Sequence, residues 1–168
     1  WLGPATESPS SEGVHPFTWR HFWDYGNGRL GDFGCHYMDL AHWALNLRQP
    51  TRIETKGPEV ESVTTPRHLQ VDYYHPAIEK RSPVHLTWDG NRTPDIVKAL
   101  KDSNGKPLNF GSGQLFVGEK GMIISNYGEH RLLPESTYKD FERPDEFIPN
   151  STGHHKEWTE AIRSSGNT

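Results

Sequence analysis

The hydrophobic pattern of this chain changes at Pro50, and this change limits the fold more than any other feature. From Leu30 to Leu47 the apolar residues recur every three or four positions, as on one face of an α-helix. Beyond Pro50 the pattern changes to short β-leaning runs separated by Pro, Gly and Asn turns. The strict strand–helix alternation that builds a parallel sheet is missing. The sequence therefore predicts an α+β fold, with an open, mainly antiparallel sheet and helices packed on one face.

Turn signals give the expected boundaries. Residues 1–29 form an irregular arm and an aromatic turn, residues 30–47 a helix, and residues 154–165 a second helix. The sheet occupies residues 51–150, with a loop excursion at 91–112 that covers something. GEKG at residues 118–121 predicts a hairpin connection. The expected strands are 51–55, 69–74, 84–88, 114–117 and 122–126.

The supply of core residues is thin for a chain of 168 residues. Six Trp and six Tyr supplement the aliphatic residues, because large rings bury much apolar area. We expect Trp88 and Trp158 in the core. A domain short of apolar residues is expected where part of its packing comes from other sequence or from a partner. We therefore expect one domain whose packing is completed by other sequence or by a partner.

Charge and hydropathy exclude several classes of function. The pI is near 6.2, the net charge is -4, and no Lys/Arg block is present, so the chain lacks the counterion-release contribution on which nucleic-acid binding depends. No apolar run reaches the length of a membrane span. The single Cys35 cannot form an internal disulfide, and its place in the helical pattern predicts a small buried residue.

The run GNGRLG at residues 26–31 matches the G-x-G-x-x-G pattern of a dinucleotide-binding loop and is followed by Glu54 at a fitting distance. The preceding residues, FWDY at 22–25, are bulky and include an acid, unlike a strand buried on both faces. No further β–α units follow. A tight glycine turn that feeds the helix is therefore favoured over a cofactor loop.

Within the helical pattern, Asp32, His36 and Asp39 are spaced i, i+4 and i+7 and so share one face, away from the apolar stripe. An imidazole can take a hydroxyl proton near neutral pH, and a carboxylate one turn away can orient it. Two alternatives stay open at this point. The face is an ordinary solvated one, or Asp32 and His36 bind a metal with His154 or His155, although no metal-site spacing supports this.

Several segments resemble the second domain of the glucose-fructose oxidoreductase / inositol dehydrogenase / MocA family. They are the WR pair Trp19 and Arg20, then GRLGDFGCHYMDLA at 28–41 with its D-x-G-x-H pattern, GQLFVGEKGM at 113–122 and GHHKEW at 153–158. The D-x-G-x-H pattern alone is weak, but the combination is specific. The resemblance covers nearly the whole chain.

The resemblance implies that residues 1–168 are one substrate-binding and oligomerisation domain, trimmed at both ends. It implies a second domain like that of dihydrodipicolinate reductase, an NAD or NADP cofactor held by a Rossmann domain absent here, and a sheet face that contacts the Rossmann domain or a second subunit in a homo-oligomer. It implies His36 as general base and Asp32 as its orienting or substrate-binding partner. Arg20, Trp19, His154 and His155 are the further candidates for substrate binding.

The leading hypothesis is therefore an NAD(P)-dependent oxidoreductase of a sugar or polyol, with this chain as its substrate domain and inactive alone. One alternative is a non-catalytic carbohydrate-binding or subunit-assembly module. Another is a relative that cleaves glycosides by an NAD-dependent route.

Overall fold

The structure is a computed structural model, and it describes residues 3, 5–6, 14 and 17–164. The chain divides into two compact units, residues 1–138 and 139–168, and each is described by itself. In chain order, the elements of the first unit are η1 (Thr18–His21), α1 (Gly28–Ala44), β1 (Arg52–Lys56), β2 (Leu69–His75), β3 (Val84–Gly90), α2 (Asp95–Lys98), β4 (Gln114–Val117), β5 (Met122–Ser125), β6 (His130–Leu133) and η2 (Glu135–Tyr138). The second unit contains α3 (His154–Ser164).

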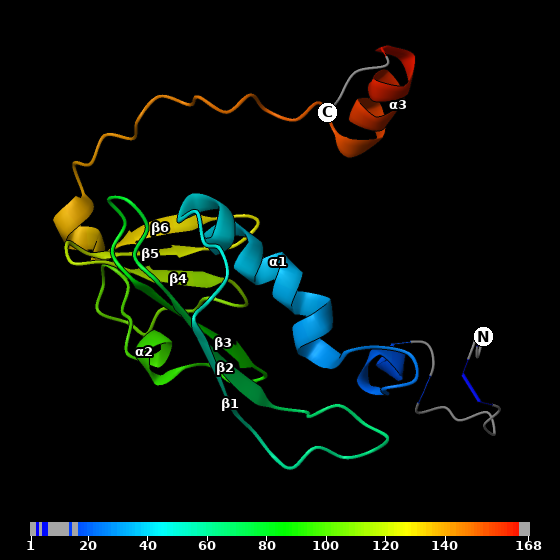
Figure 1. Cartoon of the computed structure of the whole chain (residues 1–168). Helices are drawn as coiled ribbons and strands as arrows, with labels where there is room; N and C mark the ends of the chain where they lie inside the picture. The colour runs from blue at the N-terminus through cyan, green and yellow to red at the C-terminus, as the bar shows by residue number, and fades with distance from the viewer. Residues whose placement is uncertain (1–2, 4, 7–13, 15–16, 165–168) are drawn as a thin grey trace. The chain divides into compact units, whose positions relative to one another are not determined.

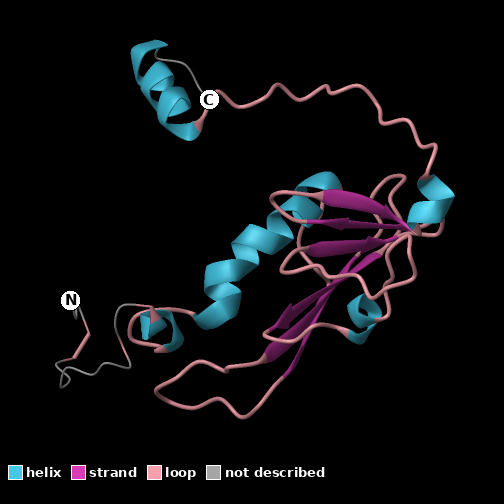
Figure 2. Cartoon of the chain, turned by 180° about the vertical axis from the view of Figure 1, so that it is seen from behind, coloured by secondary structure: helices cyan, strands magenta, loops and turns pink. Residues whose placement is uncertain are grey.

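The strands form two antiparallel sheets of three, in the orders β1-β2-β3 and β4-β5-β6. In the first sheet Val71 pairs with Trp88, and in the second Leu115 pairs with Ile124. Helix α1 contacts both sheets, through β3 and β4, and Figures 1 and 2 show it running beside them. The α+β class with antiparallel pairing is confirmed, and the strands are divided between two sheets.

Most predicted elements are present within a few residues of their expected bounds. The first helix runs from Gly28 to Ala44, and the predicted hairpin at residues 118–121 closes with a hydrogen bond from Gly118 N to Gly121 O of 2.9 Å. Strand β6 was not predicted, because its four residues, HRLL, are too few to show alternation. The short helix α2, inside the excursion at 91–112, was not predicted either.

The largest buried cluster lies on the second sheet. Leu100, Ile124 and Leu133 are 7%, 1% and 1% exposed. Half-buried residues from the excursion and from β4 and β5 pack against this cluster. The predicted excursion therefore covers the β4-β5-β6 sheet and supplies one side of its core. The half-buried residues are Val97, Leu108, Phe110, Leu115 and Met122.

The first sheet has an apolar face and a polar face. On the apolar face Val71 and Trp88 are buried side by side, so the prediction of a core role for Trp88 is confirmed. On the polar face Asp72 is buried and accepts hydrogen bonds from three side chains. Burial by itself would raise the pKa of this carboxyl group, but the hydrogen bonds outweigh burial and lower it. The three donors are Thr87, His85 and Gln70.

Two predictions of burial are wrong. Cys35 is exposed, because it lies on the solvent side of α1, where its Sγ lies 3.3 Å from the Asp32 carbonyl oxygen and donates to it. Trp158 is 66% exposed. It lies on α3 with Ile162, which is also exposed.

A histidine pair links α1 to the first sheet. His75 on β2 is 2% exposed, and its ring contacts that of His42 on α1, with centroids 5.5 Å apart. Burial lowers the pKa of His75, and the neighbouring His42 lowers it further. The neutral imidazole is therefore the form that the folded chain favours at this contact.

Truncation of the β4-β5-β6 core is expected to destabilise the chain. Ile124→Ala removes a fully buried side chain and should lower the free energy of unfolding by roughly 2–5 kcal/mol, through lost transfer energy and a cavity. Ile123→Ala is the matched control, because Ile123 precedes it on the same strand and is 42% exposed. This control should cost less than about 1 kcal/mol. Urea denaturation measures both, and equal losses would contradict the assigned core.

The buried His75 is expected to make stability depend on pH. Its folded-state pKa lies below its unfolded value, so between these two values the unfolded chain binds more protons and stability rises with pH. Stability should thus be full above about pH 6.5, the unfolded pKa of His, and fall as pH drops through the folded pKa. His75→Leu should weaken this dependence in urea titrations, whereas His130→Leu, at an exposed site, should not. An unchanged slope for His75→Leu would contradict the assignment.

Candidate functional site

The glycine turn before α1 is a packing device. Gly28 has a φ of +68°, and a Cβ built there would lie 2.7 Å from Thr65 Oγ1, so only glycine fits. A Cβ at Gly26 would lie 2.8 Å from the Arg20 backbone. The turn follows the 3-10 helix η1 and not a strand, and all described strand pairs are antiparallel. These residues do not fit a dinucleotide-binding loop, which needs a parallel βαβ unit.

His36 stands on the exposed side of α1, in the predicted acid–His face. Its Nδ1 lies 2.7 Å from the hydroxyl oxygen of Tyr127, and the two rings meet edge to face with centroids 6.3 Å apart. Tyr127 comes from the turn between β5 and β6. A contact across 91 residues therefore orients this imidazole.

The hydroxyl of Tyr127 also lies 3.4 Å from the backbone carbonyl oxygen of His36, to which it can only donate. With its proton directed there, the hydroxyl oxygen accepts from Nδ1–H of the ring. This network favours the tautomer that carries the proton on Nδ1 and leaves a lone pair on Nε2. Nε2 has no hydrogen-bond partner among the residues that the structure describes. A base with this orientation can take a proton from a bound hydroxyl group.

Asp32 is engaged by Arg20 and not by His36. The guanidinium of Arg20 forms an ion pair with Asp32 Oδ2, and the two side chains are 16% and 33% exposed. Arg20 also donates from Nε to the Phe17 carbonyl oxygen at 3.1 Å. The shared helix face was predicted correctly, but the prediction that Asp32 orients the imidazole is not supported by these contacts. One turn of helix brings the two residues to the same face without bringing their polar atoms together.

Aromatic rings hold Arg20 in place from several sides. Its guanidinium carbon lies 4.3 Å from the ring centroid of Phe17, 5.6 Å from that of Trp19 and 5.8 Å from that of Phe33. Such contacts stabilise a cation and restrict its orientation. The two predicted substrate-binding residues Arg20 and Trp19 are thus in mutual contact, and Asp32 completes the group.

A model described as the oxidoreductase family, C-terminal alpha/beta domain, matches residues 1–81. Residues 1–81 are thus similar to the C-terminal domain of this oxidoreductase family. The match includes Arg20, Asp32 and His36, and it confirms the resemblance on which their roles were predicted. Tyr127 lies outside the matched segment. No curated protein matches the chain.

The remaining predicted residues lie on a different unit. His154 and His155 begin α3, both are exposed, and their ring centroids are 4.2 Å apart. They belong to the unit 139–168. The structure therefore brings Arg20, Trp19 and Asp32 into contact, with Asp32 on the same helix as His36. His154 and His155 are described separately, on the other unit.

No group of three or more His, Cys, Asp or Glu side chains among the described residues has the arrangement of a metal site. None of the helices within residues 3–164, as far as they are described, is long and apolar enough to cross a membrane.

Sequence reasoning missed Tyr127. It lies in the turn NYGE at residues 126–129, where the Asn126 side chain accepts hydrogen bonds from the amides of Gly128 and Glu129 at 2.8 and 2.9 Å. That turn chemistry marks a loop but does not show which distant element the tyrosine meets. The signal comes from the structure, where Tyr127 is 77% exposed, because an exposed aromatic side chain is a candidate for binding.

We expect Tyr127, and not Asp32, to determine the tautomer of the His36 imidazole. Tyr127→Phe removes the partner of Nδ1 and should shift the ¹⁵N resonances of the imidazole and change its tautomer ratio. Asp32→Asn keeps the shape, weakens only the Arg20 pair, and should leave those resonances nearly unchanged. Two-dimensional ¹H–¹⁵N NMR of histidine-labelled chain measures both. A larger shift in Asp32→Asn than in Tyr127→Phe would restore the acid–His dyad and overturn the assignment.

Proposed function

We propose that this chain is the substrate-binding domain of an NAD(P)-dependent oxidoreductase that acts on a hydroxyl group of a sugar or polyol. The observation that carries the proposal is the exposed His36, whose Nδ1 is held by Tyr127 at 2.7 Å so that Nε2 faces no protein partner among the described residues. The match of residues 1–81 to the oxidoreductase family supports the reaction class. The choice of a sugar or polyol as substrate goes beyond this reaction class.

In this proposal His36 is the general base. The lone pair of Nε2 takes the proton of the substrate hydroxyl, and the O–H electron pair forms the carbonyl bond as the carbon loses a hydride. A nicotinamide cofactor, when bound, supplies the acceptor of that hydride. Because the glycine turn at 26–31 does not fit a dinucleotide, we assign the cofactor to a separate Rossmann domain. The imidazolium that forms keeps both ring protons, one of them on the Tyr127 hydroxyl.

Asp32 and Arg20 are proposed to bind the substrate hydroxyl groups. The ion pair uses Oδ2 of Asp32, and Oδ1 has no hydrogen-bond partner among the described residues, so it can accept from a hydroxyl. The pair is half-buried, and the aromatic contacts of Arg20 hold it in a fixed place. A pre-positioned acceptor of this kind favours a polyhydroxylated substrate over a hydrocarbon alcohol.

An aromatic wall stands beside the proposed base. Phe33 stacks on Tyr37 with centroids 6.4 Å apart, and Tyr37 lies 6.0 Å from Tyr127. Phe33 also lies 6.0 Å from the ring of His36. The apolar faces of such rings suit the C–H faces of a sugar ring, and their low entropy cost favours binding. We assign this wall to one side of the substrate site.

The polar face of the first sheet is the proposed contact with a second subunit. All five residues of β1 are exposed, and the neighbouring face carries Asp72, Lys56 and His85 in one charged network. A fully exposed edge strand next to a hydrogen-bonded polar surface is rarely left uncovered. Homo-oligomer formation through this face would cover it.

The proposal is tested in the protein that carries this domain together with its Rossmann domain. His36→Ala should reduce NAD(P)-dependent oxidation of its preferred sugar or polyol by about 100-fold or more, as loss of positioned acid–base catalysis does. His130→Ala, at another exposed histidine, is the matched control and should stay near wild type. A panel of sugars and polyols with a nicotinamide absorbance assay provides the measurement.

Other results would change the assignment in defined ways. Near-normal turnover of His36→Ala would remove His36 as the base. Sugar binding without cofactor reduction by the wild type would indicate a non-catalytic module. Release of free sugar without net NADH would indicate glycoside cleavage, in which the same oxidation is transient.

A further inference from the structure

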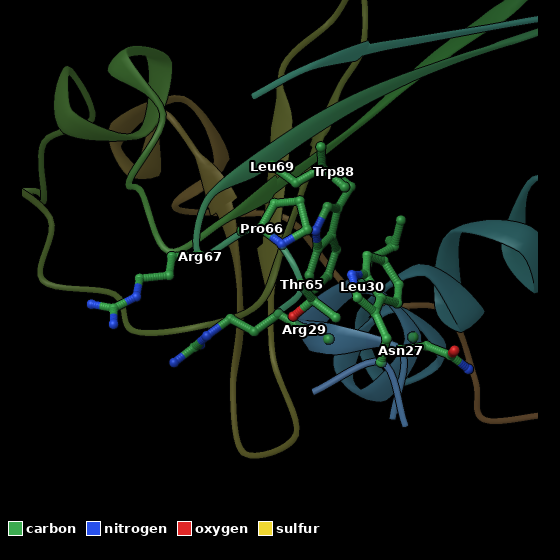
Figure 3. A pocket seen from close by; sticks show the side chains of 12 residues that line it. Asn27, Arg29, Leu30, Thr65, Pro66, Arg67, Leu69 and Trp88 are labelled. Atoms are coloured by element: carbon green, nitrogen blue, oxygen red, sulfur yellow. The ribbon is translucent and has the colours of Figure 1, made fainter. Parts of the chain in front are cut away.

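A pocket of about 280 Å³ lies at the N-terminal end of α1. Arg20, Asp32 and His36, which the proposed reaction uses, do not line it. The first turn of α1 forms one side, and the loop before β2 together with Trp88 of β3 forms the other. Figure 3 shows Thr65, Trp88 and Leu30 gathered around it. Its apolar walls come from Leu30, Pro66, Leu69 and the two rings of Trp23 and Trp88.

Three residues that line this pocket carry a buried hydrogen-bonding atom without a partner among the described residues, namely Arg29 Nε, Thr65 Oγ1 and Trp88 Nε1. Thr65 is 4% exposed and Trp88 is 9% exposed, yet neither Thr65 Oγ1 nor Trp88 Nε1 makes a hydrogen bond with any described residue. A buried polar group left without a partner costs about 1–3 kcal/mol. Most buried polar groups in native structures have a partner, so Thr65 Oγ1 and Trp88 Nε1 are candidates for contact with a ligand. Both groups can donate, and the indole can only donate, so they fit a ligand that carries hydrogen-bond acceptors.

The same end of the pocket is electropositive. The first amides of α1 have no partner within the helix, and Asn27 makes no side-chain capping hydrogen bond. The α1 macrodipole adds partial positive charge at this end. Arg29 and Arg67 line the rim, and Figure 3 shows their guanidinium ends extending to one side of the pocket. Of the described residues that line it, none is Asp or Glu.

The lowered pKa of His21, a neighbouring residue, supports a positive electrostatic potential at the N-terminal end of α1. Burial lowers the pKa of His21, and the charges of three nearby guanidinium groups lower it further. Asp32 opposes them only as the smallest contribution. The three groups belong to Arg29, Arg20 and Arg67.

We propose that this pocket binds a small organic anion, with its carboxylate or phosphate group at Thr65, Trp88 and the first amides of α1. The apolar part of the ligand lies against Leu30 and Leu69, which line the same pocket, and the two arginines at the rim attract the charge. The pocket is at the lower end of the range for ligand sites, which favours a compact ligand over a dinucleotide. This inference goes beyond the proposed reaction, since none of its residues acts on the substrate hydroxyl.

Benzoate is the probe, because it combines one carboxylate with a compact apolar body. The readout is the indole N–H resonance of Trp88 in ¹H–¹⁵N spectra of the 168-residue chain, assigned with Trp88→Phe. Benzoate should shift this resonance saturably with a Kd on the order of 1 mM, as expected for a small ligand. Benzyl alcohol, a neutral molecule of the same shape, should shift it much less at equal ionic strength. Equal shifts for both, or none, would overturn the anion site.

Thr65→Val and Thr64→Val form the matched pair of variants. Thr65→Val removes the unpartnered hydroxyl and keeps the side-chain shape, so it should weaken benzoate binding about tenfold, the effect of losing one hydrogen bond to a charged group. Thr64 directs its hydroxyl to Glu61 at 2.8 Å and does not line the pocket, so Thr64→Val should bind as the wild type does. Unchanged binding by Thr65→Val would overturn the assigned position of the anionic group.

A second variant keeps the test decisive if Thr65→Val alters the fold. Arg67 is exposed, so Arg67→Gln should leave the far-ultraviolet circular dichroism unchanged. It should weaken benzoate binding several-fold and reduce the dependence of binding on salt, because one long-range attraction is lost. Phenyl phosphate in place of benzoate distinguishes the two anionic groups by their relative affinities. Binding that does not respond to Arg67→Gln or to salt would contradict an electrostatic site.

Discussion

The close approach of Gly28 to Thr65 is the contact on which the arrangement of this chain depends. A side chain at position 28 would collide with Thr65 Oγ1, and the amide of Thr65 donates to His21 O at 2.7 Å. The loop before β2 is thereby joined to the residues before α1. Since β2 is the central strand of its sheet, this junction fixes where α1 begins relative to that sheet. The direction of every side chain along α1 follows from that starting point.

The candidate base then depends on a second, more distant contact. Two helical turns beyond Gly28, the exposed side of α1 presents His36 to the hairpin turn between β5 and β6, where the Tyr127 hydroxyl oxygen lies 2.7 Å from Nδ1 and accepts its proton in a hydrogen bond. That hairpin is positioned by the core of Ile124 and Leu133, which the excursion at 91–112 covers. The orientation of one exposed imidazole thus rests on the packing of the second sheet. The excursion at 91–112 therefore supports the site indirectly, because it covers the core that positions Tyr127.

The sequence was sufficient for the helix, five of the strands and the face of α1 that carries Asp32 and His36, because these follow from the spacing of apolar residues and from turn chemistry. It was not sufficient for the partners of those side chains. Asp32 and His36 are one turn apart, and spacing alone could not show that Arg20 occupies the carboxylate. The pairing of His36 with Tyr127 spans 91 residues, and no local pattern encodes it. The prediction that Cys35 is buried was wrong for a related reason, since a position in a helix does not by itself show which side of the helix faces solvent.

Charge is distributed unevenly around the start of α1. The two sites share this helix but differ in their electrostatic surroundings. Asp32 forms an ion pair with Arg20, whereas Arg29 and Arg67 have no carboxylate among the residues that line the pocket. The lowered pKa of His21 is consistent with an excess of positive charge there. The same helix therefore offers two different environments. Its positive N-terminal end, where buried donors have no partner among the described residues, suits an anion, and its exposed side, with an imidazole and a paired acid, suits a hydroxyl group.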